Sequence, residues 1–401
     1  MTNGFWFYVS RPLNAPDFQE VLDGDGKANW IYRFAPVESL NGQKDMGFTR
    51  RLQACFLFLV SCFWFIPCAR SAQPEDRAIV DQAVDRALEY LQRTQQTTGA
   101  WVGENNQRSP AISALAVMAF LSAGHVPGEG KYGETVTKGV DWVLQQQHAN
   151  GLIAPGGHQE MYHHGICTLM LAEVVGMTEG KQADEIRRKL VKAVEIILRA
   201  QRTTGQHKGG WRYTVAGNDG DISVTGWQIM ALRAAKNLGC DVPAERIQMA
   251  VEYIKRCQDP STGGFRYHPG AHLTIPCTGT SILALEICGK EYHRAPELLK
   301  AGSFLLRNPP QWGQAYFPYA IYYCSQATFQ LGGQYWESYR AKLHESLFRN
   351  QSANGAWQEG HLGPIYPTAM AVLALTVEYR YLPIYQRAEE PTDLAEKHGP
   401  K

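Results

Sequence analysis

Residues 209–235 read GGWRYTVAGNDGDISVTGWQIMALRAA, and this stretch joins the two features that decide the fold. Its first part is a glycine turn followed by an aromatic residue, and such a turn recurs along the chain. Its second part, from Val224 onward, carries apolar residues at the spacing of a helix. Between the two parts lies the acidic pair Asp219 and Asp221. The turn indicates the architecture, and the acidic pair is the first candidate for chemistry.

The turn belongs to a repeated pattern of a glutamine, a glycine and a large apolar residue. The copies are Gln95-Gly99-Trp101, Gln147-Gly151-Ile153, Gln201-Gly205 with an insertion before Gly210-Trp211, Gln258-Gly263-Phe265 and Gln351-Gly355-Trp357. The stretch 308–313, NPPQWG, resembles a degraded further copy. Glycine permits a tight turn, the aromatic residue can pack back on the preceding helix, and glutamine can bond helix-end groups of an adjacent hairpin. The repeat therefore predicts a chain of linked helical hairpins.

An amphipathic run precedes each copy and a more apolar run follows it, which predicts six helical hairpins. The first runs are about 76–96, 134–148, 183–202, 244–258, 295–307 and 335–351. The second runs are about 110–123, 161–175, 222–238, 277–288, 316–330 and 367–380. One such hairpin cannot bury both of its faces, so successive hairpins must pack together. Because the first and last copies are alike, we expect an all-α, closed double ring with the second helices inside.

The glutamine–glycine–tryptophan spacing resembles the QW motif of terpenoid cyclases. Further local matches are MYHHG at 161–165, GDISVTGWQ at 220–228 and LGGQYW at 331–336. With these motifs the chain resembles the α/α toroids of the terpenoid-cyclase and protein-prenyltransferase superfamily, and more narrowly the bacterial single-toroid prenyltransferase and squalene-oxidase repeat proteins. The resemblance implies an α6/α6 toroid over residues 76–385 around a central cavity. It leaves the function open, because this fold serves cyclases, prenyltransferase subunits and non-catalytic modules.

Residues 46–72 have the pattern of a secretory signal peptide: two arginines, an apolar run, and then small residues. Signal peptides begin at an N-terminus, so Met46 is a natural start, and residues 1–45 are interpreted as a non-native or disordered extension. We therefore expect an exported, extracytoplasmic protein, cleaved near residue 72. The alternative is an uncleaved membrane anchor through residues 52–67, which would give peripheral membrane association.

The composition excludes several classes of function. The 39 Lys and Arg residues nearly balance the 38 Asp and Glu residues, so the chain offers no basic surface for nucleic acid. Phosphate-binding glycine loops, a GxSxG nucleophile elbow and a DDxxD diphosphate motif are all missing from the sequence. We therefore expect no cofactor and no nucleic-acid partner, while the oligomeric state stays open. The polar segment 386–401 is expected to be a disordered tail.

The acidic pair lies at the predicted start of an inner helix. Squalene-hopene-type cyclases, which the chain resembles, carry an Asp-x-Asp-Asp motif there that protonates a double bond. The resemblance would make Asp221 the catalytic acid and Asp219 its modulator, although Ile222 replaces the last aspartate of the motif. The first alternative is that Asp221 caps the helix by accepting backbone N–H groups. The second is that Asp221 contacts a ligand without catalysis.

Aromatic residues gather near the predicted starts of the inner helices and would line the cavity. Such rings can stabilise a carbocation without quenching it, but they also pack helices together. The predicted substrate-binding residues are Tyr162, His164, Trp227, Tyr316 and Tyr319. A zinc ion would need three or four converging ligands. The loose sets His163–His164–Cys167 and His268–His272–Cys277 lack the spacing for this, so no metal site is predicted.

Three functions are compatible with these features. The first is a terpene-cyclase-like protein, which would be an isomerase of the cyclase and mutase kind acting on a polyprenyl or triterpene-like hydrocarbon. The second is an exported, non-catalytic toroid that binds a lipid, a glycan or a protein. The third is a protein like the prenyltransferase β subunit, although Ser223 stands where that family places a zinc-binding cysteine after Asp221. A second acid that reaches Asp221, from Glu160, Glu173 or Glu286, would favour the first.

Overall fold

The computed structural model describes residues 17–22, 28–33 and 74–386. The chain divides into two units, Met1–Arg77 and Ala78–Lys401. In the first unit, strands β1 (Asp17–Leu22) and β2 (Ala28–Arg33) form an antiparallel hairpin in which Asp17 lies opposite Arg33. The sequence patterns do not predict this hairpin.

Two predicted segments lie outside the described residues. The signal segment 46–72 is one of them, together with the anchor alternative 52–67 inside it. The other is the tail 386–401, of which only Gln386 is described. Within the described ranges, the helices are too short or too polar to cross a bilayer.

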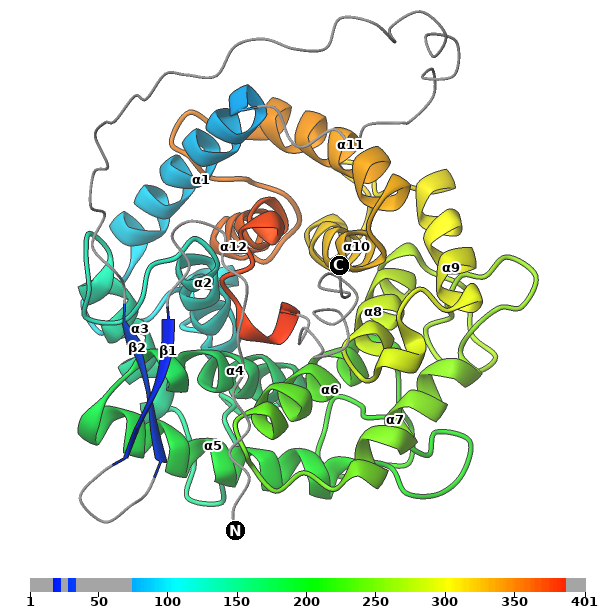
Figure 1. Cartoon of the computed structure of the whole chain (residues 1–401), viewed down its shortest axis with the longest axis horizontal. Coiled ribbons are helices and arrows are strands. Elements are labelled where there is room, and N and C mark those ends of the chain that lie inside the picture. Colours follow the sequence, from blue (N-terminus) through cyan, green and yellow to red (C-terminus); the bar gives the residue numbers. More distant parts are fainter. Residues whose placement is uncertain (1–16, 23–27, 34–73, 387–401) are drawn as a thin grey trace, which may run out of the picture. The chain divides into compact units, whose positions relative to one another are not determined.

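The helices of the second unit alternate between an outer and an inner ring (Figure 1). The outer helices are α1 (Pro74–Thr94), α3 (Gly133–Gln145), α5 (Gly180–Ala200), α7 (Ala244–Arg256), α9 (Pro296–Arg307) and α11 (Gln334–Asn350). The inner helices are α2 (Pro110–Ser122), α4 (Glu160–Val174), α6 (Ile222–Asn237), α8 (Ile275–Glu286), α10 (Phe317–Leu331) and α12 (Ile365–Leu375). Each inner helix packs against the next, and α12 packs against α2, so the inner ring closes. The all-α toroid of six hairpins is confirmed.

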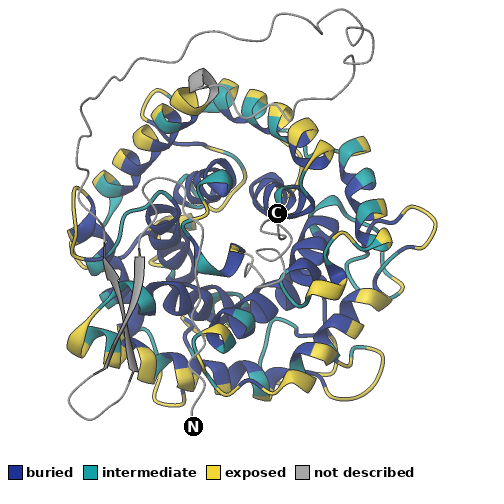
Figure 2. Cartoon of the chain, viewed as in Figure 1, coloured by how far each residue is buried: buried dark blue, intermediate teal, exposed yellow. Residues whose placement is uncertain are grey.

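The two rings differ in burial as their sequences predict. Helix α2 is buried along its whole length, whereas α5 buries one stripe that includes Ile186, Leu190 and Ile197. Figure 2 shows the same contrast around the ring, with mostly buried inner helices and exposed outer surfaces. Inner helices are apolar on all sides because they face the outer ring on one side and the ring interior on the other.

The repeat glutamines tie the ring together. The Nε2 amide of Gln95 donates to the carbonyl of Gly99 in its own turn (3.0 Å) and to that of Thr135 in α3 (2.9 Å). The other four glutamines bond in the same way to Gly151 and Lys189, to Gly209 and Arg246, to Gly263 and Glu297, and to Gly355 and Ala83. In the third copy the partner is Gly209 and not Gly205, because the insertion lies between the glutamine and the glycine.

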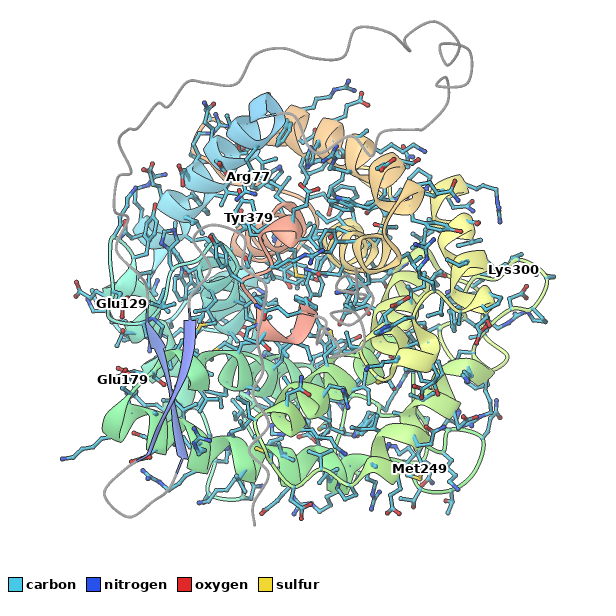
Figure 3. All side chains as sticks on the ribbon, viewed as in Figure 1. Arg77, Glu129, Glu179, Met249, Lys300 and Tyr379 are labelled. Atoms are coloured by element: carbon cyan, nitrogen blue, oxygen red, sulfur yellow. The ribbon has the colours of Figure 1, made fainter. Side chains whose placement is uncertain are left out.

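The repeat glycines allow each turn to lie directly on the next outer helix. Gly209 has a φ of +94°, and a Cβ atom there would lie 1.9 Å from the carbonyl oxygen of Met249 in α7. At Gly99 the corresponding distance, to Lys138 in α3, is 2.1 Å. Figure 3 labels Met249 on this outer face of the ring. A larger residue would push the turn away from the helix and break the glutamine bonds.

The repeat aromatics pack back on the helix that precedes them, as the sequence predicts. The indole N–H of Trp101 donates to the carbonyl of Leu91 at 2.8 Å, and its backbone N–H donates to Ser113 Oγ of α2 at 2.9 Å. The same two bonds join Trp211 to Ile197 and Thr225, and Trp357 to Leu347 and Thr368. Each of these three tryptophans therefore links an outer helix to its inner partner.

Gln351 closes the ring, because its amide joins the last turn to Ala83 of α1 at 2.8 Å. Gln351→Ala would leave the carbonyls of Ala83 and Gly355 without this donor. We expect it to lower the free energy of unfolding by about 2 kcal/mol. Gln311→Ala, in the degraded copy, is the matched control: Gln311 is exposed, and we expect a change within about 0.5 kcal/mol. Urea denaturation measures the free energy of unfolding of both variants, and equal decreases would contradict the role of Gln351 in closing the ring.

The last described residues enter the centre of the inner ring, where Figure 1 shows the red C-terminal turn η5 (Pro383–Tyr385). The backbone N–H of Ile384 points to Glu173 Oε2 of α4 at 3.4 Å. From α10, Gln330 Nε2 donates to the carbonyl of Tyr385 at 2.9 Å, and Tyr322 bonds the Tyr385 hydroxyl. Glu173 and Gln330 lie at the C-terminal ends of α4 and α10, whereas Tyr322 lies in the first half of α10. The chain itself therefore occupies part of the centre where the resemblance implies a cavity.

Candidate binding site at the inner helix starts

The acidic pair is positioned by the backbone of the third repeat. The N–H of Asp221 donates to the carbonyl of Trp211 at 2.9 Å, so the two residues form one antiparallel bridge. This bridge brings Arg212 beside Asp221. Residues 212–220, which we call the 212–220 loop, are held by the buried guanidinium of Arg202, which donates to the carbonyls of Asp219 at 2.7 Å and Val215 at 3.0 Å.

Asp221 is fully buried and accepts hydrogen bonds on both carboxylate oxygens. Its Oδ1 accepts the N–H of Val224 at 2.9 Å and the hydroxyl of Ser223 at 2.5 Å. Its Oδ2 accepts from Arg212 Nη1 at 2.8 Å. The helix cap predicted for Asp221 is therefore confirmed. Asp219, whose side chain is 58% exposed, pairs with the Nε of the same arginine at 3.1 Å.

Tyrosines from neighbouring hairpins surround this ion pair. The Arg212 guanidinium lies 4.2 Å from the ring centre of Tyr213 and 5.4 Å from that of Tyr267. It also donates to the Tyr267 hydroxyl at 2.9 Å, which in turn lies 2.5 Å from the Tyr213 hydroxyl. Tyr162 of α4 stacks on Tyr213 with 5.7 Å between ring centres. We call this cluster the tyrosine site: Tyr162, Arg212, Tyr213, Asp219, Asp221, Ser223, Tyr267 and Tyr319.

The tyrosine site is deep but not sealed. Burial, with a further contribution from Asp221, raises the pKa of Tyr162 well above its ordinary value. Burial also raises the pKa of Tyr319 in α10, and Cys277 and Tyr162 add to this rise. Both tyrosine side chains nevertheless keep part of their surface exposed, as do Tyr213 and Tyr267. Tyr162 and Tyr319 lie in the first turns of α4 and α10, so this partly exposed surface is at the N-terminal end of these inner helices.

His163 borders the same end of α4. Its Nδ1 accepts the N–H of Ala111 at 3.3 Å, and burial lowers its pKa to about 4. The imidazole is therefore neutral at pH 7, and its proton lies on Nε2. The side chain is half-buried, so this N–H is a candidate donor for a ligand.

The remaining predicted lining residues lie elsewhere. His164 is buried and uses both ring nitrogens on the backbone, accepting from Ile153 N–H at 3.1 Å and bonding the carbonyl of Ala193 at 2.9 Å. It takes the place that Ser113 and Thr225 have in other repeats. Trp227 stacks on Tyr322 with ring centres 5.4 Å apart, inside the core. These contacts leave His164 and Trp227 as parts of the packing in this structure.

Tyr316 is the opposite case. It is 75% exposed and precedes α10 with a φ of +65°, a conformation that costs a bulky residue about 1–3 kcal/mol. Packing does not explain this strain, because the ring contacts mostly solvent. Tyr319, which lies three residues further along the chain, belongs to the tyrosine site. Tyr316 is thus an exposed aromatic residue at the same end of the ring.

The family is shown by the sequence. The prenyltransferase alpha-alpha toroid domain matches residues 43–211 and 212–302, which is more than half of the chain. The chain belongs to this toroid family. The structure extends the family's ring beyond the matched residues, since α10, α11 and α12 lie after residue 302 and complete the toroid. No curated protein matches the chain.

Solved structures share the fold at low identity. An inactive variant of the α-1,6-mannanase GH76A of Salegentibacter sp. HEL1_6, in complex with α-1,6-mannotriose, matches with a TM-score of 0.58 and 12% identity, over 75% of this chain and 99% of that chain. The type II terpene cyclase MstE from Scytonema matches with a TM-score of 0.52 and 15% identity, over 76% of this chain and 99% of that chain. A protein from Actinoplanes matches with a TM-score of 0.51 and 16% identity, over 75% of this chain and 98% of that chain. At these identities the likeness concerns the fold alone.

The three candidate second acids do not bond to Asp221. Glu160 Oε1, at the start of α4, accepts the N–H of Val215 in the 212–220 loop at 2.8 Å. Glu173 and Glu286 lie at the other ends of α4 and α8. Among the residues that the structure describes, no three His, Cys, Asp or Glu side chains gather as a metal site.

Arg212 is the central residue that the sequence patterns do not single out. Its signal is its position directly after the repeat tryptophan, in the only copy with an acidic pair at the junction. Arg266 follows Phe265 in the next copy and pairs with Asp259, so the position after the aromatic residue can carry an ion pair in this toroid.

Proposed function

We propose that this toroid is a binding protein whose ligand occupies the tyrosine site, and that Asp221 organises this site without donating a proton. The ion pair and helix cap of Asp221 carry the proposal. Val224, Ser223 and Arg212 donate to three of the about four lone pairs of its carboxylate. A proton on Asp221 would remove the charge that these donors stabilise, and a hydrogen bond to a charged group contributes about 1.5–3 kcal/mol. The partly exposed rings around it supply contact surface.

The compartment is part of the proposal. The signal-like segment 46–72 supports export, so the protein would bind its ligand outside the cytoplasm. The mannanase of the same fold is described in complex with α-1,6-mannotriose, which makes a glycan chain a natural first probe. Membrane attachment through residues 52–67 would hold the toroid near a membrane surface.

The second candidate is protonation-initiated cyclisation of a polyprenyl or triterpene-like hydrocarbon. The observation in its favour is the position of Asp221 at the start of an inner helix, with Asp219 linked to it through Arg212. The fold shared with the terpene cyclase MstE supports a hydrophobic small molecule as the ligand. Against it, residues 382–385 occupy the ring centre, and the buried Ile222 stands in place of an acid. A prenyltransferase-like subunit has no specific observation in its favour.

One experiment separates the two candidates. The purified protein and its Asp221→Asn variant are incubated with squalene and geranylgeraniol, and extracts are analysed by mass spectrometry. In parallel, saturation-transfer NMR measures binding of α-1,6-mannotriose, geranylgeraniol and choline. We expect no cyclised product, together with binding of at least one probe that Tyr162→Phe combined with Tyr319→Phe weakens. Product from the unsubstituted protein alone would establish a cyclase, and a folded protein that binds none of the probes would contradict the binding function.

A further inference from the structure

The direction of one hydroxyl hydrogen bond at the tyrosine site is determined by its neighbours. The Tyr162 hydroxyl lies 2.5 Å from Ser223 Oγ, and Ser223 Oγ lies 2.5 Å from Asp221 Oδ1. A carboxylate only accepts, so the single hydroxyl proton of Ser223 points to Asp221. Ser223 must then accept from Tyr162. The Tyr162 proton is directed to Ser223, so the Tyr162 hydroxyl has no proton left to donate and can only accept a further hydrogen bond.

The same logic applies to Tyr319. Its hydroxyl lies 2.8 Å from Thr280 Oγ1, and Thr280 donates its own proton to the carbonyl of Pro276 at 2.9 Å. Tyr319 therefore donates to Thr280, and its oxygen is also left as an acceptor. The partners of the two hydroxyls lie on adjoining parts of α6 and α8. Tyr162 bonds Ser223 of α6, and a Cβ atom on Gly226, three residues further along α6, would lie 2.2 Å from Cγ2 of Thr280, the partner of Tyr319. Two tyrosines from α4 and α10 thus present a pair of acceptors.

The charged groups of the site are already paired with one another. Arg212 pairs with both Asp219 and Asp221, and a second arginine, Arg202, donates to the backbone carbonyl of Asp219 at 2.7 Å. Arg212 also donates to Tyr267, which shares a second hydrogen bond with Tyr213, so this pair of hydroxyls keeps one proton for a ligand. An ionic ligand would have to break these contacts. A neutral ligand with hydroxyl groups would leave them intact.

We propose that the tyrosine site recognises a neutral polyol or carbohydrate chain, whose hydroxyl groups donate to Tyr162 and Tyr319. This inference rests on the proposed binding function. Carbohydrates combine donor hydroxyls with apolar C–H faces, and the half-buried rings of Tyr162 and Tyr213 offer surface for such a face. The exposed ring of Tyr316, held at positive φ beside α10, is a second platform for a longer chain.

The test compares sugars that differ only in their donors. Cellotriose, maltotriose and mannotriose are each measured beside their per-O-methylated forms by saturation-transfer NMR and calorimetry. Methylation keeps the ring and the ether oxygens but removes every hydroxyl proton. We expect at least one free sugar to bind and its methylated form to bind about 10-fold more weakly or not at all, as expected from the loss of two hydrogen bonds.

Variants locate the effect. Tyr162→Phe and Tyr319→Phe should each weaken sugar binding about 5-fold, since each removes one acceptor. Tyr292→Phe is the matched control, because Tyr292 follows the far end of α8. Equal binding of methylated and free sugars, or binding of geranylgeraniol or choline with no sugar bound, would overturn this inference while the binding function stands. If folded protein binds none of the probes, both proposals are wrong.

Discussion

Glu173→Gln is expected to stabilise the protein by about 3 kcal/mol at pH 7. Glu173 is fully buried at the end of α4, and burial raises its pKa from 4.5 to about 8, with a small opposing effect of the Ile384 N–H. At pH 7 this carboxyl group is charged in the unfolded protein, and folding must either protonate it or bury its charge. The cost is about 1.4 kcal/mol for each pH unit above its unfolded pKa, up to its folded pKa. Glutamine keeps an oxygen for Ile384 and never ionises.

The sign of the pH dependence follows from proton binding. Between pH 4.5 and about 8 the folded state holds a proton on Glu173 that the unfolded state has lost. The free energy of unfolding therefore falls as pH rises through this window, and the contribution is constant above it. At pH 4.5 the parent and Glu173→Gln proteins should be nearly equal. Above pH 8 their difference should reach about 5 kcal/mol.

Urea denaturation at pH 5, 7 and 8.5 measures this difference directly. Other carboxylates titrate in both proteins and cancel. Glu173→Leu serves as the control, since it also removes the titration but leaves the buried N–H of Ile384 without its acceptor, and it should be less stable than Glu173→Gln. A difference that does not change between pH 5 and 8.5 would show that Glu173 is not held neutral beneath the C-terminal segment.

The fold is predictable from the sequence because each device of the ring is local or strictly periodic. Gln95 reaches a glycine four residues ahead, and the same amide meets the next outer helix because every hairpin repeats the geometry. The third copy misleads, since Gly205 has the spacing but Gly209 makes the contact. The central position of Tyr385 cannot be predicted, because its partners in α6 and α10 lie far away in the sequence and no repeat places them.

The site is predictable in part for the same reason. Asp221 and Tyr162 are marked by their positions at inner-helix starts, and the structure brings them together through Ser223. His164 also lies near the start of an inner helix, but its ring nitrogen accepts the N–H of Ile153, a bond that a serine or threonine hydroxyl accepts in other copies of the repeat. Polar residues in the interior satisfy backbone groups before they serve a ligand, and a sequence does not show which backbone groups lack partners. The role of Arg212 could not be predicted from the sequence, because its two carboxylate partners lie in a loop and at a helix cap whose positions the repeat does not determine.

Arg212→Met should destabilise the protein by about 3 kcal/mol or more. The substitution keeps much of the side-chain length but leaves the carboxylate of Asp221, which is fully buried, without its guanidinium. Removing one partner of a buried ion pair costs about 3–5 kcal/mol, because an uncompensated charge remains. Asp221→Asn should cost less, about 1–2 kcal/mol, since asparagine still caps α6 and Arg212 still has Asp219.

The double variant tests whether Asp221 acts by organising the site or as a catalytic acid. With both charges removed, the buried site is neutral, so Arg212→Met combined with Asp221→Asn should be more stable than Arg212→Met alone. Denaturation of the four proteins measures this coupling, and additive losses would show that the ion pair does not organise the site. Sugar binding should follow the same order if Asp221 acts by holding Ser223 and, through it, the Tyr162 hydroxyl. A catalytic acid would behave differently: Asp221→Asn alone would abolish turnover, and removing Arg212 as well would restore nothing.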